Sequence, residues 1–118
     1  MKRINFKNES FRFRLSLRDA QGAELGIADV EGIEAKFYGE FEKKVWLQYA
    51  WPFKEGFEEV ERHDDDYFAL EITPEQAQTA PTGTIIVQVT YKVTDDDFTQ
   101  GFKQITEKGK VLILKDVL

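Results

Sequence analysis

The sequence predicts an all-β protein that folds as one β-sandwich over residues 1–118, with about seven or eight strands. Short segments rich in β-branched and aromatic residues recur along the chain, and clusters of turn residues separate them. The composition suits a packed core, with 42% hydrophobic residues, 10 Phe and only 3 Pro. A chain of 118 residues is long enough for one core and short for two, so we expect a single domain.

The first predicted strand covers residues 11–18, where apolar and polar residues alternate strictly. This two-residue period is typical of a strand with one buried face. The members expected to face inward are Phe11, Phe13, Leu15 and Leu17. Those expected to face outward are Arg12, Arg14, Ser16 and Arg18. The Asp-Ala-Gln-Gly sequence at residues 19–22 predicts the turn that follows.

The middle of the chain predicts three further strands and a loop. Residues 32–39 form the first of these strands, and residues 45–51 form a second that Pro52 ends or places at a sheet edge. The inward-facing members of the first are Ile33, Ala35 and Phe37. Residues 57–61 predict a weaker strand, and the charged residues 62–66 predict a polar loop.

A short helix is expected immediately after a strand at residues 67–72, whose inward members are Phe68, Leu70 and Ile72. Thr73 is a suitable N-cap, Pro74 suits the first helical position, and Gln76 completes a capping box. A proline and a glycine follow closely and limit the helix to residues 73–79.

The last third of the chain predicts three strands. Residues 84–92 are rich in β-branched side chains and form the clearest of them. Its inward-facing members are Ile85, Val87, Val89 and Tyr91. The acidic residues 95–97 predict a loop, and residues 102–106 and 110–115 predict two separate strands after it.

Residues able to carry catalysis are scarce. The chain has no Cys and a single His, His63, which lies among charged residues. A catalytic His needs partners that the sequence does not display, so we expect no enzyme, no catalytic residues and no cofactor. The triplets Asp64–Asp66 and Asp95–Asp97 leave two interpretations open: solvated turns, or carboxylates that share a Ca²⁺ ion if the loops meet. Neither has EF-hand spacing, and we predict no metal site.

Two patches are candidate binding surfaces. In residues 45–51, alternation places Val45, Leu47, Tyr49 and Trp51 on one face and Trp46, Gln48 and Ala50 on the other. Trp46 is then either exposed or covered by another element, and Trp46, Tyr49 and Trp51 are either a sugar-binding surface or core. The second patch is the outward row of Arg12, Arg14 and Arg18, which either grips an anionic partner or keeps a strand face solvated.

The charge of the chain is unevenly distributed. The net charge is −6, yet residues 1–18 carry six basic residues and Glu9 as the sole acid. The remaining residues carry 10 basic and 21 acidic side chains. An acidic body disfavours nucleic acid as a partner. The basic leading segment suits an acidic partner, either another protein or a second copy of this chain in a homo-oligomer.

Three blocks carry a resemblance to a known family. They are Phe-Arg-Phe-Arg-Leu with its turn at residues 11–22, Glu-Ala-Lys-Phe at 34–37, and the strand, helical turn and strand at 70–89, which begins Leu-Glu-Ile-Thr-Pro-Glu-Gln. Together they resemble the small immunoglobulin-like β-sandwich domains of phage tails and baseplates, most nearly the N-terminal domain of phage baseplate upper proteins. The resemblance implies an immunoglobulin-like sandwich that docks neighbouring tail proteins and has no catalytic residues.

These observations favour a structural interaction domain of a phage or prophage tail or baseplate. The alternative is a carbohydrate-binding module that uses exposed aromatic residues on a polysaccharide. The N-terminus has no apolar stretch of the kind found in signal peptides, and no apolar run has the length of a membrane span. We therefore expect a protein without a membrane partner that is cytoplasmic before assembly and then part of the virion tail.

Overall fold

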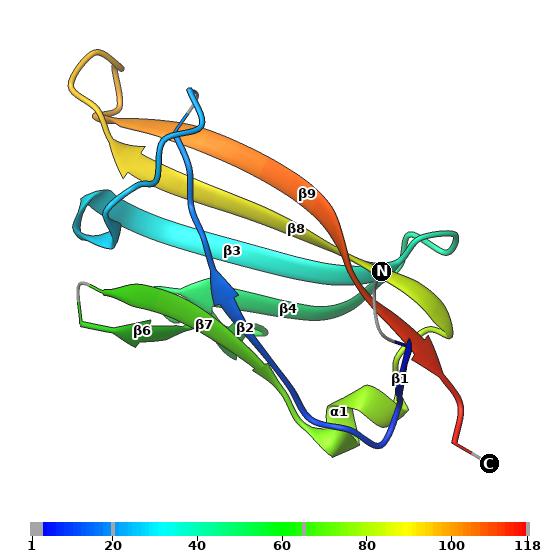
Figure 1. Cartoon of the computed structure of the whole chain (residues 1–118). Coiled ribbons are helices and arrows are strands. Elements are labelled where there is room, and N and C mark those ends of the chain that lie inside the picture. The colour runs from blue at the N-terminus through cyan, green and yellow to red at the C-terminus, as the bar shows by residue number, and fades with distance from the viewer. Residues whose placement is uncertain (1–3, 20, 65, 118) are drawn as a thin grey trace.

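The computed structural model describes residues 4–19, 21–64 and 66–117, and they form two packed β-sheets (Figure 1). The strands are β1 (Ile4–Phe6), β2 (Phe11–Leu15), β3 (Val30–Gly39), β4 (Val45–Trp51), β5 (Glu58–Glu59), β6 (Glu61–His63), β7 (Tyr67–Ile72), β8 (Gly83–Thr94) and β9 (Phe102–Lys115). The helices are a 3-10 turn, η1 (Ile27–Asp29), and α1 (Pro74–Gln78). The predicted all-β sandwich is confirmed, with nine strands in the described residues where seven or eight were expected.

The larger sheet has six strands in the order β1-β9-β8-β3-β4-β5. Its long antiparallel strands β3, β8 and β9 run side by side across the molecule (Figure 1). The prediction of two separate strands at 102–106 and 110–115 is wrong, because β9 is continuous. Pairing with β8 keeps Lys108 and Gly109 extended opposite Gln88 and Val87.

The smaller sheet has three strands in the order β2-β7-β6. The chain reaches it from the larger sheet at Val60, which is fully buried between β5 and β6. The predicted strand at 57–61 is therefore divided between the two sheets. His63 was expected in a loop but ends β6, and the turn begins at Asp64, which has a left-handed φ of 51°.

The core lies between the two sheets and contains the side chains that alternation placed inward. Phe37 on β3, Phe68 and Leu70 on β7, and Ile85 and Tyr91 on β8 are each at most 1% exposed. The predicted strand at 11–18 is shorter in the structure, since β2 loses its partner β7 after Leu15. The alternation nevertheless continues, and Leu17 is buried at 3% exposure.

The helix α1 forms as its sequence predicts. Thr73 Oγ1 accepts a hydrogen bond from Gln76 N at 3.2 Å, and Gln76 Oε1 accepts one from Thr73 N at 2.9 Å. These reciprocal bonds satisfy backbone donors that the first turn of a helix leaves free. Among the residues described, no helix is both long enough and apolar enough to cross a lipid bilayer.

The strand β1 was not predicted, because three residues are too few to show a period. It lies parallel to the end of β9, with Ile4 opposite Ile113 and Phe6 opposite Lys115. This pairing covers only the last residues of β9 on that side. The edge of β9 before residue 113 is not covered by β1.

Candidate functional site

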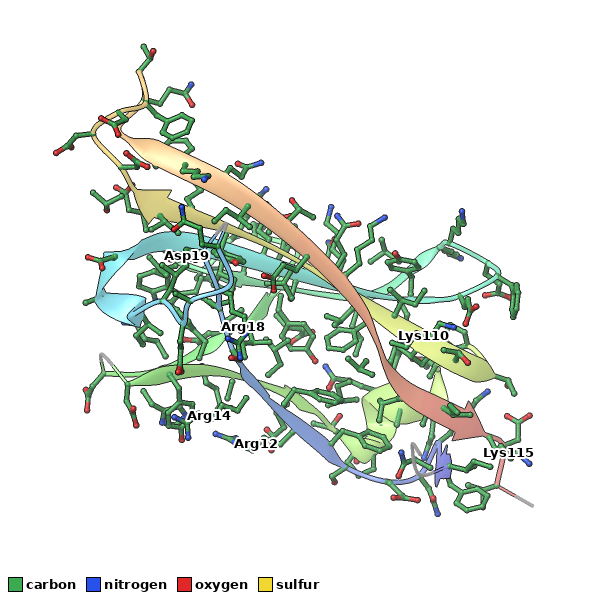
Figure 2. The ribbon with its side chains drawn as sticks, turned by 45° about the horizontal axis from the view of Figure 1, so that its top comes forward. Arg12, Arg14, Arg18, Asp19, Lys110 and Lys115 are labelled. Carbon is green, nitrogen blue, oxygen red and sulfur yellow. The ribbon has the colours of Figure 1, made fainter. Side chains whose placement is uncertain are left out.

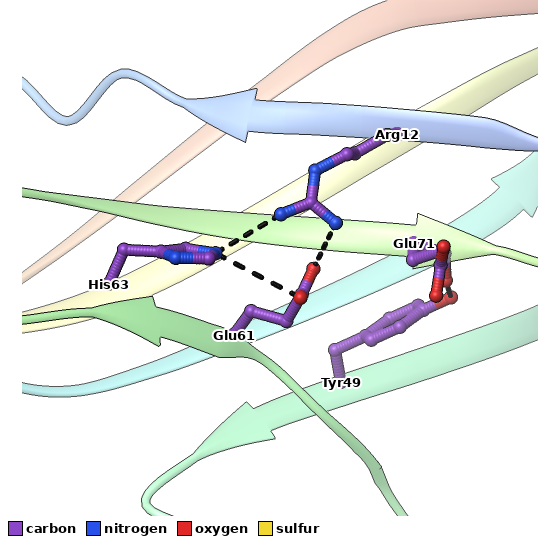
Figure 3. A network of polar contacts seen from close by, with 5 residues as sticks. All are labelled: Arg12, Tyr49, Glu61, His63 and Glu71. Atoms are coloured by element: carbon purple, nitrogen blue, oxygen red, sulfur yellow. Dashed lines mark hydrogen bonds and ion pairs between the residues drawn. The ribbon is translucent and has the colours of Figure 1, made fainter.

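The arginines of β2 lie on the outer face of the smaller sheet, as predicted, and Arg12 is part of a polar network there (Figure 3). Arg12 Nη1 forms an ion pair with Glu61 Oε2 at 2.7 Å, and Arg12 Nη2 lies 3.1 Å from His63 Nε2. Because a guanidinium can only donate, His63 Nε2 must be the acceptor in this contact. The network joins β2 to β6 across β7 and engages both Nη1 and Nη2 of Arg12 within the protein.

Arg14 lies one step further along the same face. Its guanidinium carbon is 4.2 Å from the centre of the Tyr67 ring, which stacks on His63 with ring centroids 4.4 Å apart. Asp66 Oδ1 is 3.8 Å from Arg14 Nη2, a loose ion pair between two well exposed side chains. Arg14 remains 65% exposed, so it is available to a further anionic group.

Arg18 is not part of this row. It lies in the segment after β2, where its Nη1 donates to Gly22 O at 2.9 Å. Its backbone carbonyl accepts a short hydrogen bond from the Tyr91 hydroxyl, and its backbone N–H lies 3.2 Å from the same hydroxyl. The predicted turn at 19–22 is formed, with Asp19 Oδ1 accepting from the backbone of Gln21; Ala20 lies outside the described residues.

The aromatic residues of β4 do not form an open surface. A β-bulge leaves Trp46 without a partner on β3, since Phe37 pairs with Leu47 and Tyr38 with Val45. The bulge overturns the predicted alternation at the start of β4 only: Val45 faces outward at 42% exposure, whereas Trp46 packs on buried Phe37 with ring centroids 6.2 Å apart. Leu47, Tyr49 and Trp51 lie opposite the inward residues of β3, as predicted.

These aromatic side chains also contact residues of other elements. Trp46 lies beneath α1, where its Nε1 donates to Gln76 O at 3.2 Å. Trp51 contacts both Phe68, with ring centroids 5.3 Å apart, and the Arg62 guanidinium, whose carbon lies 4.5 Å from its ring centre. Tyr49 is 2% exposed, and its hydroxyl donates to Glu71 O at 2.6 Å. Of the two interpretations left open for Trp46, Tyr49 and Trp51, the structure favours core over a sugar-binding surface.

The two acidic turns belong to different sheets, one between β6 and β7 and the other between β8 and β9 (Figure 1). Asp95 Oδ1 accepts a hydrogen bond from Asp97 N at 3.0 Å, which is an ordinary turn contact. The described residues contain no group of three or more His, Asp or Glu side chains arranged to hold a metal ion; Asp65 lies outside them.

A groove with a volume of about 260 Å³ opens between β2 and β9. Phe37 and Leu70 lie at its base, and Val87 and Val89 of β8 continue its apolar surface. The groove exists because the three-stranded sheet is too narrow to cover the six-stranded one. Opposite β2, Gly109 leaves the β9 wall without a side chain, and an ideal Cβ built there contacts nothing within 4 Å.

Both strands beside this groove have unpaired edges within the described part of the chain. β2 pairs with β7 on one side only. β9 pairs with β8 along its length, whereas β1 covers its other edge only at residues 113–115. Sequence reasoning missed this site, because alternation reports which face of a strand is buried but not which of its edges is free.

The charges beside the groove contrast with the rest of the chain. Residues 11–18 and 102–115 together carry seven basic residues and one acid, Glu107, although the whole chain has a net charge of −6. Figure 2 shows Arg12, Arg14 and Arg18 along β2 and its continuation, and Lys110 and Lys115 along β9. Of the four lysines on β9, Lys110 lies opposite Ile86, on the outer face of the larger sheet, and 3.6 Å from Glu40. Lys2 and Arg3 of the predicted basic segment lie outside the described residues.

The fold and this groove define the class to which the chain belongs: an all-β, two-sheet protein with an open side between β2 and β9. Comparison with protein-family models, with curated proteins and with solved structures found no match to the chain.

Proposed function

We propose that this protein is a non-catalytic structural domain of a phage or prophage tail or baseplate, and that it docks neighbouring proteins of the particle. The observation that carries the docking role is the open side between β2 and β9, where an apolar groove lies between two unpaired strand edges. Natural proteins usually cover or shorten such edges, because a free edge can pair with another chain. The tail or baseplate setting rests on the resemblance of residues 11–90 to phage sandwich domains.

The charge distribution supports a protein partner. Seven of the 16 basic residues lie in the two segments beside the groove, so this side of an acidic molecule attracts an acidic surface. The partner is a neighbouring tail or baseplate protein, and a second copy of this chain would use the same complementarity in a homo-oligomer.

Incorporation into particles tests the proposal. In the strain that encodes this chain, an epitope-tagged copy should sediment with tail-bearing particles after induction, and gold-labelled antibody should mark one end of the tail. Deletion of the gene should leave particles with incomplete tails. If the tagged protein stays in the soluble fraction while particles form normally without the gene, the proposed function is wrong.

A further inference from the structure

The groove between β2 and β9 has the properties of a vacant strand position. The smaller sheet ends at β2, and the next position beyond β2 lies over β8 and β9 of the larger sheet. A strand in that position would pair with the free edge of β2 and bury one face on Val87, Val89 and Val111. The sandwich would then have a wider second layer, with the groove filled.

We propose that this groove binds an extended segment of a partner protein in which acidic and apolar residues alternate, as an added strand of the smaller sheet. The inference deepens the proposed docking function and rests on it. The segment is about five residues long, the length of the β2 edge.

The apolar half of the pattern follows from the inner face of β9. Register with β8 places Gly109 opposite Val87 and Glu107 opposite Val89, so both side-chain positions belong to the inner face. The Glu107 carboxylate there lies 3.2 Å from the Tyr91 hydroxyl, and the apolar lining comes from Val87, Val89 and Val111. A glycine at this position weakens a strand unless something approaches it closely. The space above Gly109 accepts a large apolar side chain from the added strand, beside Phe13 and Val111.

The acidic half follows from the charges at the rim. Side chains on the outer face of an added strand would lie next to those of Arg12 and Arg14 on β2. Arg12 is already paired with Glu61, whereas Arg14 is 65% exposed and, among the described residues, lies over the Tyr67 ring and forms a loose ion pair with Asp66. Lys108 of β9 also borders the groove, but register with β8 places it opposite Gln88, on the outer face of the larger sheet. Opposite charges on neighbouring strands stabilise pairing, and like charges oppose it.

Nuclear magnetic resonance with a synthetic peptide tests this proposal. The probe is a blocked peptide of about seven residues that alternates Glu and Val, long enough to pair along β2. Saturable amide shifts should concentrate in residues 11–16 and 107–111, and the β2 amides should become protected from hydrogen exchange. A scrambled peptide of the same composition should give no saturable shifts. A peptide with Lys in place of Glu should bind at least about threefold more weakly.

Two variants separate the apolar and charged contributions. Gly109→Leu fills the groove where a Cβ meets no other atom, so it should abolish binding without unfolding the protein. Its matched control is Gln104→Leu, on the other face of β9, which should bind normally. Arg14→Glu should weaken binding of the acidic peptide about threefold to tenfold, and its control Lys92→Glu should not.

The outcomes are distinct. Absence of shifts, shifts outside β2 and β9, or equal binding of the scrambled peptide would overturn the strand proposal. Shifts at β2 and β9 that appear on concentrating the protein alone would assign the groove to a second copy and also overturn it. If particle incorporation succeeds while peptide binding fails, the docking function stands and only this description of its site is wrong.

Discussion

Two buried tyrosine hydroxyls connect parts of the protein that are distant in sequence. Tyr49 on β4 donates to Glu71 O on β7 and so joins the two sheets directly (Figure 3). Tyr91 on β8 donates to Arg18 O and holds the segment that follows β2 against the larger sheet. Burial raises the pKa of Tyr91 above its ordinary value. Burial, then the nearby carboxylates of Glu58 and Glu71, raises the pKa of Tyr49.

Replacing Tyr49 with Phe should lower the free energy of unfolding by about 1 kcal/mol at neutral pH, because Glu71 O loses its donor. The folded state holds the Tyr49 proton more tightly than the unfolded state does. The contribution of Tyr49 to the free energy of unfolding is therefore fully present below a pH of about 10, the pKa of a tyrosine in the unfolded chain. The free energy of unfolding of the wild type should fall as the pH rises above that value. The fall should be smaller in Tyr49→Phe, which lacks the titrating hydroxyl. Chemical unfolding followed by tryptophan fluorescence at pH 8 and 10.5 measures both effects.

The control for this prediction is Tyr38→Phe, on the solvent side of β3. It should leave neutral stability nearly unchanged. An alkaline loss of stability as large in Tyr49→Phe as in the wild type would contradict the assignment to Tyr49.

At the level of secondary-structure elements, a local capping motif positions the helix α1, which covers one end of the core. The capping box of α1 fixes the helix over Trp46, whose indole N–H reaches both Gln76 O and Thr79 Oγ1. A helix of five residues has little stability of its own, so its cap and its packing on the indole determine whether it forms.

Removing the cap should loosen this cover. Thr73→Ala leaves Gln76 N without its acceptor and should lower the free energy of unfolding by about 0.5–2 kcal/mol. Thr73→Ser retains the hydroxyl and should cost much less. Denaturant unfolding of both variants checks this, and equal destabilisation by Ala and Ser would contradict a capping role.

A close approach between β3 and the turn before β8 is a second element-scale constraint. An ideal Cβ on Gly39 would lie 2.9 Å from Pro81 Cβ. Gly39→Ala should therefore force the two segments apart and lower the melting temperature, at a cost of about 1–3 kcal/mol. Gly26→Ala is the matched control, because a Cβ there meets nothing within 4 Å, and its melting temperature should change little. Calorimetry of both variants measures the difference.

At the scale of the whole molecule, one narrow sheet packs on one wide sheet, and their unequal widths create the open side. The middle strand of the narrow sheet, β7, contributes most to the core, as the full burial of Phe68, Leu70 and Ile72 shows. Burial of β8 and β9 is less complete, since Val87 is only half-buried. The molecule thus retains an apolar surface that its own described residues leave open, and we relate this surface to docking.

If the groove is kept open for a partner, closing it should not harm the isolated protein. Gly109→Leu should raise the free energy of unfolding by about 0.5–1 kcal/mol, because Gly is unfavourable inside a strand and Leu would cover Val87 and Val111. Thermal unfolding of the free protein measures this change. A clear loss of stability would show that Gly109 is required by the fold itself and not by an incoming strand.

Features that depend on neighbours along the chain could be predicted from the amino-acid sequence. Strict alternation identified the buried faces of β2, β3, β7 and β8, since side chains of a strand point to opposite faces in turn. The Thr73 cap also needs only residues within one turn. The same local information placed Arg12 and Arg14 on an outer face but could not show that Glu61 and His63 lie beside Arg12.

Which strands meet, and where their pairing stops, became visible in the folded protein alone. Alternation assumes a regular ladder, so it misplaced Val45 and Trp46 at the bulge, where β3 and β4 shift register. The sequence pattern predicted two strands where β9 is one, because the continuity of β9 depends on pairing with β8. It also did not show that the chain passes from one sheet to the other at Val60. The groove between β2 and β9 could not be predicted either. Its strand edges are unpaired because of the order of strands in the sheets, and that order depends on contacts between residues distant in sequence.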